Sequence, residues 1–167
     1  MKLVCCPAPS LPDVCREWAP SHVLTLASPG KPGPGSFGGA CQLHLAFNDV
    51  VEARPGLVLP RRGDLDRIIA FGRTWDRVAP LVVSCEAGVS RSTAALFAIA
   101  CDRWPDMSEA LIATCLREAA PCATPNPLLV SLADRILGRR GRMSQAVSAI
   151  GRGVDYIPYR AFVLPLP

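Results

Sequence analysis

A cysteine and an arginine stand on either side of a short Gly/Ser segment. Cys85 follows the apolar run 81–83, Gly88 lies inside the segment, and Arg91 precedes the apolar run 94–101. Apolar β-branched residues are typical of a buried strand, a Gly/Ser segment of a tight loop, and an Ala/Leu/Ile run of a helix. The sequence therefore predicts a strand, a loop and a helix in succession, with the cysteine opening the loop and the arginine closing it.

This arrangement combines a nucleophile with an anion-binding backbone. At such a junction the loop N–H groups converge, and the helix N-terminus carries about half a positive charge, so the concavity suits a phosphate dianion. The same field favours a nucleophilic thiolate at Cys85. Arg91 can present its planar guanidinium to two phosphate oxygens, which lysine cannot do. Ser92 can hydrogen-bond the Cys85 sulfur and ease its departure when a phosphocysteine is hydrolysed.

The Cys-x5-Arg loop resembles the signature of cysteine-dependent protein tyrosine phosphatases, and the run 86–92 looks most like that of their small dual-specificity members. The resemblance implies a phosphomonoester hydrolase that works through a phosphocysteine intermediate, without a cofactor or a metal. Its substrate would be a phosphorylated protein or another phosphomonoester. The residues that it implies for phosphate binding are Glu86, Ala87, Gly88, Val89, Ser90 and Arg91.

Asp49 is the residue that we expect to act as general acid. It follows the alternating run 41–47, at the end of an expected strand, where open α/β sheets gather functional groups. In the family that this chain resembles, an aspartate upstream of the nucleophile protonates the leaving oxygen, a step worth about 10²- to 10⁴-fold. An Asn-Asp pair is also an ordinary turn signal. Asp64 and Asp66 are the rivals, although Asp64 looks like a helix cap.

Two further positions bear on the resemblance. A Pro-Asn pair like the one at 125–126 helps to brace the phosphate loop in many dual-specificity phosphatases, and Asn126 is also expected to cap a helix that begins with Pro127. The residue before the nucleophile is usually histidine in these enzymes, but here it is Ser84. A phosphate-binding module with little catalysis is therefore one alternative. A rhodanese-like sulfurtransferase, whose loop also begins with cysteine, is another.

The elements that must position these residues form an α/β pattern. We expect strands at 3–6, 21–27, 41–47 and 81–85, and helical faces within 11–18, 65–75, 94–101, 108–119 and 128–136. This pattern predicts a single α/β domain over residues 1–167, with a mostly parallel central sheet of four to five strands and helices on both faces. The basic segment 139–167 is expected to be a solvated or loosely packed tail.

Composition excludes several classes of function. Of 167 residues 50% are hydrophobic and 19% charged, which favours one folded domain. Apolar runs are too short to span a bilayer or to act as a secretory signal, so no membrane association is expected. A net charge of +4 without interleaved aromatic residues makes nucleic acid a poor candidate. The eight cysteines include no CxxC pair, so we expect no metal site and a cytoplasmic location.

Overall fold

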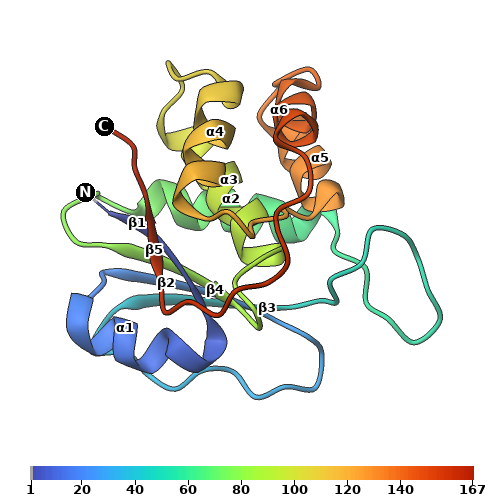
Figure 1. The fold of residues 1–167 in the computed structure, drawn as a ribbon. Coiled ribbons are helices and arrows are strands. Elements are labelled where there is room, and N and C mark those ends of the chain that lie inside the picture. The colour runs from blue at the N-terminus through green and yellow to red at the C-terminus, as the bar shows by residue number, and fades with distance from the viewer. Residues whose placement is uncertain (1) are drawn as a thin grey trace.

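The structure is a computed structural model that describes residues 2–167, and a five-stranded sheet runs through its centre (Figure 1). The strand order is β3-β2-β4-β1-β5. The first four strands in the chain are parallel, and β5 is antiparallel to β1. The predicted mostly parallel sheet is therefore confirmed. The strands are β1 (Leu3–Pro7), β2 (His22–Ala27), β3 (Cys41–Ala46), β4 (Leu81–Cys85) and β5 (Phe162–Leu164).

Helices cover both faces of the sheet, as predicted (Figure 1). Alternate side chains of a strand point to opposite faces. Val4 and Val82 pack against α1, while Cys5 and Val83 belong to the larger core beneath the other helices. The helices are α1 (Leu11–Trp18), α2 (Arg62–Thr74), α3 (Arg91–Arg103), α4 (Glu109–Ala119), α5 (Pro127–Ile136) and α6 (Arg142–Ile150), with a short 3-10 turn at Ala8–Ser10.

Helix α3 is the element that fixes the site. Its residues from Arg91 to Cys101 are all buried, because α3 lies between the sheet and the outer helices α2, α4 and α5. A helix that is apolar nearly all round is typical of such a position. The first turn of α3 is therefore packed close to the end of β4, which sets where the loop between them lies.

The helix ends follow the expected capping chemistry. The Ser108 hydroxyl accepts a hydrogen bond from the Leu111 N–H at 3.2 Å, and Asn126 caps α5 directly before Pro127. The Asp64 carboxylate accepts from the Arg61 N–H at 2.8 Å, in the first turn of α2. Such contacts satisfy N–H groups that have no partner within the helix. Asp64 is thus engaged in holding a helix end.

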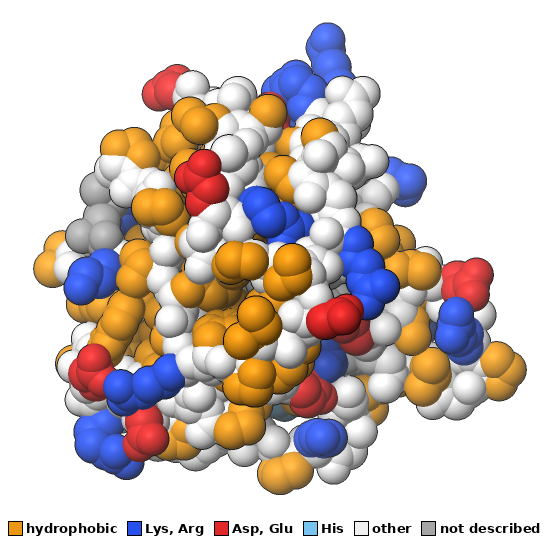
Figure 2. Space-filling view, in the orientation of Figure 1, with side chains coloured by type: hydrophobic (Ala, Val, Ile, Leu, Met, Phe, Trp, Pro, Cys, Tyr) orange, Lys and Arg blue, Asp and Glu red, His pale blue; other side chains and the backbone are white. Residues whose placement is uncertain are grey.

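Residues 139–167, expected to be a solvated or loosely packed tail, contain both a helix and a strand. Helix α6 packs against α4 and α5, and β5 pairs with β1. Arg139 and Arg142 form ion pairs with the buried carboxylate of Glu109, at 3.2 and 3.1 Å. Figure 2 shows hydrophobic side chains gathered in the middle of the face that this segment crosses.

Within residues 2–167, no helix is long and apolar enough to cross a membrane.

Candidate active site

The loop at residues 86–90 joins β4 to α3 and depends on a glycine. Gly88 has a φ of +73°, in the left-handed region that favours glycine. A Cβ there would overlap the Tyr159 hydroxyl and lie 3.0 Å from the Pro7 nitrogen. The Tyr159 hydroxyl donates a hydrogen bond to the Gly88 carbonyl at 2.6 Å. The C-terminal segment thus supports the loop from outside, at the one position where a side chain cannot fit.

Cys85 and Ser92 meet at the junction of β4 and α3. The Cys85 sulfur lies 3.1 Å from the Ser92 hydroxyl oxygen, and both residues are buried. The Cys5 thiol on β1 donates to the same hydroxyl at 3.3 Å. Burial, with the nearby Cys85, raises the pKa of Cys5 well above its ordinary value, so Cys5 stays a neutral donor. Its contact leaves the hydroxyl hydrogen of Ser92 free to point at the Cys85 sulfur.

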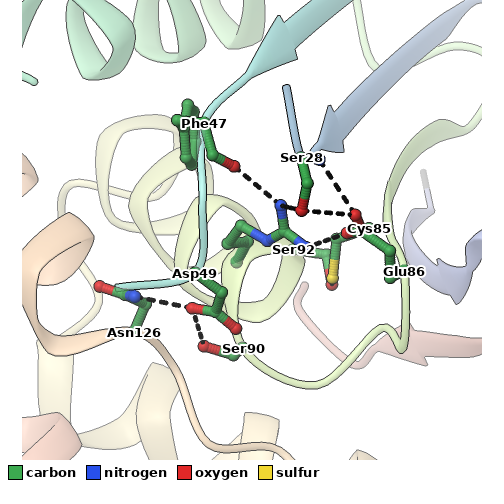
Figure 3. A network of polar contacts seen from close by, with 9 residues as sticks. Ser28, Phe47, Asp49, Cys85, Glu86, Ser90, Ser92 and Asn126 are labelled. Atoms are coloured by element: carbon green, nitrogen blue, oxygen red, sulfur yellow. Dashed lines mark hydrogen bonds and ion pairs between the residues drawn. The ribbon is translucent and has the colours of Figure 1, made fainter. Parts of the chain in front are cut away.

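The guanidinium of Arg91 is buried and held on several sides. Its Nη1 donates to the Phe47 carbonyl at 2.8 Å and lies 3.4 Å from the Ser28 hydroxyl, and its Nη2 pairs with the Glu86 carboxylate (Figure 3). Its Nε has no hydrogen-bond partner among residues 2–167. A buried donor without an acceptor costs about 1–3 kcal/mol. An anion seated in the loop between Cys85 and Arg91 would supply that acceptor.

Glu86 has a role that the sequence did not indicate. Beyond its place in the loop backbone, its carboxylate accepts from the Ser28 N–H at 3.0 Å and from the Ser28 hydroxyl at 2.9 Å. Because the same carboxylate pairs with Arg91, it fixes the guanidinium relative to the end of β2. Glu86 and Ser28 therefore orient the cation that closes the loop.

Asp49 lies at the rim of the same loop. Its Oδ1 accepts from the Ser90 hydroxyl at 2.8 Å and from the Asn126 side-chain amide at 2.7 Å (Figure 3). Asp49 is exposed, and its Oδ2 has no hydrogen-bond partner in the described part of the chain. By contrast, Asp66 pairs with Arg62 on the surface of α2 at 3.7 Å. Of the three aspartates considered, Asp49 is the one with a contact to the loop in residues 2–167.

The segment that leads into α5 braces the loop from the other side. The side chain of Asn126 accepts from the N–H groups of residues 128 and 129 while it donates to Asp49. Its backbone N–H donates to the Ser90 carbonyl at 3.3 Å, and the Thr124 N–H donates to the Val89 carbonyl at 2.9 Å. The structure thus places Asn126 where it can brace the loop and cap the helix at once.

Ser84 and Cys85 direct their side chains to opposite faces of β4. As the residue before Cys85 on β4, Ser84 points to the opposite face of the sheet, toward α1, and is 1% exposed. Its hydroxyl has no hydrogen-bond partner in the described residues.

Among residues 2–167, no group of three or more His, Cys, Asp or Glu is arranged to hold a metal ion.

Comparisons with solved structures identify the fold. Human DUSP28 superposes with a TM-score of 0.61 at 20% identity, over 88% of this chain and 94% of that one. DUSP15 gives 0.61 at 16% identity over 88% and 90%, and the Yvh1 phosphatase domain from Chaetomium thermophilum gives 0.60 at 15% over 84% and 93%. Neither a protein-family model nor a curated protein sequence matches the chain. The chain has the fold of these dual-specificity phosphatases.

Proposed function

We propose that this protein is a phosphomonoester hydrolase that acts on phosphorylated protein side chains through a phosphocysteine intermediate. One observation carries the proposal: the Cys85 sulfur and the Arg91 guanidinium stand at the two ends of one loop at the N-terminus of α3. The buried Nε of Arg91 there lacks an acceptor in residues 2–167. A tetrahedral dianion matches both the converging N–H groups and the free donor.

In the first chemical step the Cys85 thiolate attacks phosphorus. A sulfur–phosphorus bond forms as the phosphorus–oxygen bond to the leaving group breaks, and the protonated Asp49 gives its proton to the leaving oxygen. Arg91 and the loop N–H groups hold the three remaining oxygens, where negative charge accumulates.

In the second step a water attacks phosphorus and displaces the sulfur. The Asp49 carboxylate now takes the proton from that water, and the products are inorganic phosphate and the Cys85 thiolate. Ser92 stabilises the departing thiolate through its hydroxyl, which is 3.1 Å from the sulfur. The Cys5 thiol can donate to the Ser92 oxygen or to the Gly88 carbonyl, and in the first case the Ser92 hydrogen is available to the leaving sulfur.

The loop sequence favours protein phosphates over phosphoinositides. PTPMT1, another structural neighbour with a TM-score of 0.57 at 14% identity, has been solved in complex with PI(5)P. The loop of the present chain carries no lysine, so it lacks extra positive charge for a polyanionic headgroup. We therefore place phosphotyrosine and phosphoserine or phosphothreonine side chains first among the substrates.

Turnover of an aryl phosphate such as p-nitrophenyl phosphate tests the proposal. The unmodified protein should release phosphate without added metal, and Cys85→Ser should abolish release. Cys41→Ser is the matched control, because Cys41 is a free, exposed cysteine and its replacement should leave turnover unchanged. Phosphate release that survives Cys85→Ser would remove the proposal.

A phosphate-binding module is the second candidate, because Ser84 stands before the nucleophile where the enzymes that this chain resembles usually have histidine. Stoichiometric binding of a phosphopeptide to the unmodified protein, with no phosphate released over hours, would establish this second function instead.

A further inference from the structure

A cavity lies beside the loop, on the face of the sheet that α1 covers. Its volume is about 470 Å³, within the range of about 300–1,000 Å³ that is usual for ligand sites. The start of α1, the end of β2 and the segment 31–37 enclose it, and Cys85 and Glu86 contribute to its wall. Most of the lining side chains are apolar, among them Leu11, Pro12, Pro32, Pro34 and Phe37, and Lys31 lines the cavity as well.

One buried polar side chain that lines this cavity lacks a hydrogen-bond partner in residues 2–167. Ser84 lines the cavity and is 1% exposed, and its hydroxyl oxygen has no hydrogen-bond partner in residues 2–167. The neighbouring Cys6 thiol, whose pKa burial raises to about 12 and a contact with the Ser84 hydroxyl lowers in part, is a weak partner for a hydroxyl and makes no hydrogen bond of normal geometry with it. The other two polar side chains of the sheet wall satisfy each other, since the Thr25 hydroxyl lies 2.8 Å from Nδ1 of His44. Ser84 is therefore free to bond a ligand atom.

These features define the occupant by its chemistry. Largely apolar walls with one buried free hydroxyl, and with the exposed Lys31 ammonium beside them, suit an aromatic ring that carries a single hydrogen-bonding atom and whose face can meet a cation, such as the phenol of tyrosine or the indole of tryptophan. The cavity shares Cys85 and Glu86 with the loop, so its occupant can belong to the molecule whose phosphate the loop binds. Residues of an extended peptide rise about 3.3 Å each, which keeps neighbouring side chains within reach of both sites.

We propose that this cavity binds the side chain of a tyrosine or tryptophan that flanks the phosphorylated residue of a peptide substrate. This inference rests on the proposed phosphatase function and adds a specificity site to it. Ser84 bonds the polar atom of the ring, and the apolar walls bury the remainder.

Three phosphopeptides that differ at one position beside the phosphorylated residue test the proposal. A scan of the flanking positions first identifies the one at which tyrosine changes kcat/KM. Tyrosine there should raise kcat/KM about tenfold or more over alanine, because burying a large side chain is worth about one factor of ten or more. Phenylalanine, which buries a similar area but lacks the polar atom, should keep a gain of about tenfold over alanine and lie about fivefold below tyrosine. The gain should appear mainly as a lower KM, since the ring contacts ground state and transition state alike.

Substitutions in the cavity separate its role from catalysis. The Ala27 side chain on β2 faces the cavity, so Ala27→Phe should fill it and reduce the tyrosine preference to within about twofold, with p-nitrophenyl phosphate turned over as before. Phe37→Ala removes part of the wall and should weaken the preference as well. Ala110→Phe, an exposed position on α4, is the matched control and should keep the full preference.

Equal kcat/KM for the three peptides at every flanking position, or a tyrosine preference unchanged in both Ala27→Phe and Phe37→Ala, would overturn the inference. Binding to Cys85→Ser, measured by fluorescence anisotropy, distinguishes this failure from failure of the phosphatase proposal. If the protein releases no phosphate from any substrate but still binds the tyrosine peptide about tenfold more tightly than the alanine peptide, the cavity assignment stands and the phosphatase assignment falls.

Discussion

Glu86, the first residue of the loop, and Arg91, the first residue of α3, form an ion pair. The carboxylate also accepts two hydrogen bonds from Ser28, and the guanidinium also donates to the Phe47 carbonyl. The cation is therefore fixed by the ends of β2 and β3 before any anion arrives. Such preorganisation means that little reorganisation is needed when phosphate binds.

Glu86→Ala should release the guanidinium and lower kcat/KM for an aryl phosphate by about tenfold or more. A hydrogen bond to a charged group is worth about 1.5–3 kcal/mol, and the loss falls on the orientation of Arg91. Steady-state kinetics measure the effect. Glu118→Ala on the exposed surface of α4 is the control and should be silent. If kcat/KM for Glu86→Ala equals that of the unmodified protein, the ion pair does not orient the Arg91 guanidinium.

Asp49→Asn should slow hydrolysis most for substrates with poor leaving groups and little for those with good ones. The reason is that only a poor leaving group needs a proton as its bond to phosphorus breaks. A series of aryl phosphates of different leaving-group pKa measures this dependence. Asp64→Asn, which alters a helix cap, is the comparison. A leaving-group dependence in Asp64→Asn that is absent in Asp49→Asn would reassign the acid.

Ser92→Ala should slow hydrolysis of the phosphocysteine more than its formation. The hydroxyl stabilises the sulfur only when it departs as thiolate, so formation of the intermediate depends less on it. Rapid-mixing kinetics should then show a burst of the released phenol followed by a slow steady rate. Ser144→Ala on α6 provides a control far from the loop in the chain. The absence of a burst in Ser92→Ala would assign its role to the first step.

Glu109→Gln should destabilise the protein at neutral pH by about 1–3 kcal/mol, the usual cost of disrupting a buried, charge-assisted contact. Burial alone would raise the pKa of Glu109, but the hydrogen bond from Arg142 and the charges of Arg142 and Arg139 outweigh it and lower the pKa. With a lowered pKa in the folded state, the stabilisation is complete above the ordinary glutamate pKa of about 4.3 and is lost as pH falls through the folded-state value.

Denaturant unfolding at several pH values measures that contribution. The difference in unfolding free energy between the unmodified protein and Glu109→Gln should be constant from neutral pH to about pH 5 and should shrink below it. Glu118→Gln provides the control and should show no such pH dependence. A difference that grows as the pH is lowered would contradict the assignment.

The local parts of this site were predictable from sequence, because their geometry is set within one strand-loop-helix unit. The order of Cys85, Gly88 and Arg91 fixes a loop between a buried strand and a buried helix, and the structure has both. The position of Asp49 after β3 could be predicted for a similar reason. Parallel strands bring their carboxyl ends to one edge of the sheet.

Contacts between residues far apart in the chain could not be predicted. Ser28 lies 63 positions from Arg91, Cys5 lies 87 from Ser92, and Tyr159 lies 71 from Gly88. No periodicity links such pairs, since each depends on strand order and on the path of the C-terminal segment back to β1. The C-terminal strand itself is three residues long, too short to stand out as an alternating pattern.

The identity of the covalent intermediate tests the central claim most directly. Ser92→Ala mixed with an aryl phosphate and quenched in acid within the burst should carry one additional phosphoryl group by intact mass, and fragmentation should assign it to Cys85. The same treatment of Cys85→Ser should leave the mass unchanged. Steady release of phosphate with the phosphoryl group on another residue would contradict the account, as would steady release with no adduct at any quench time.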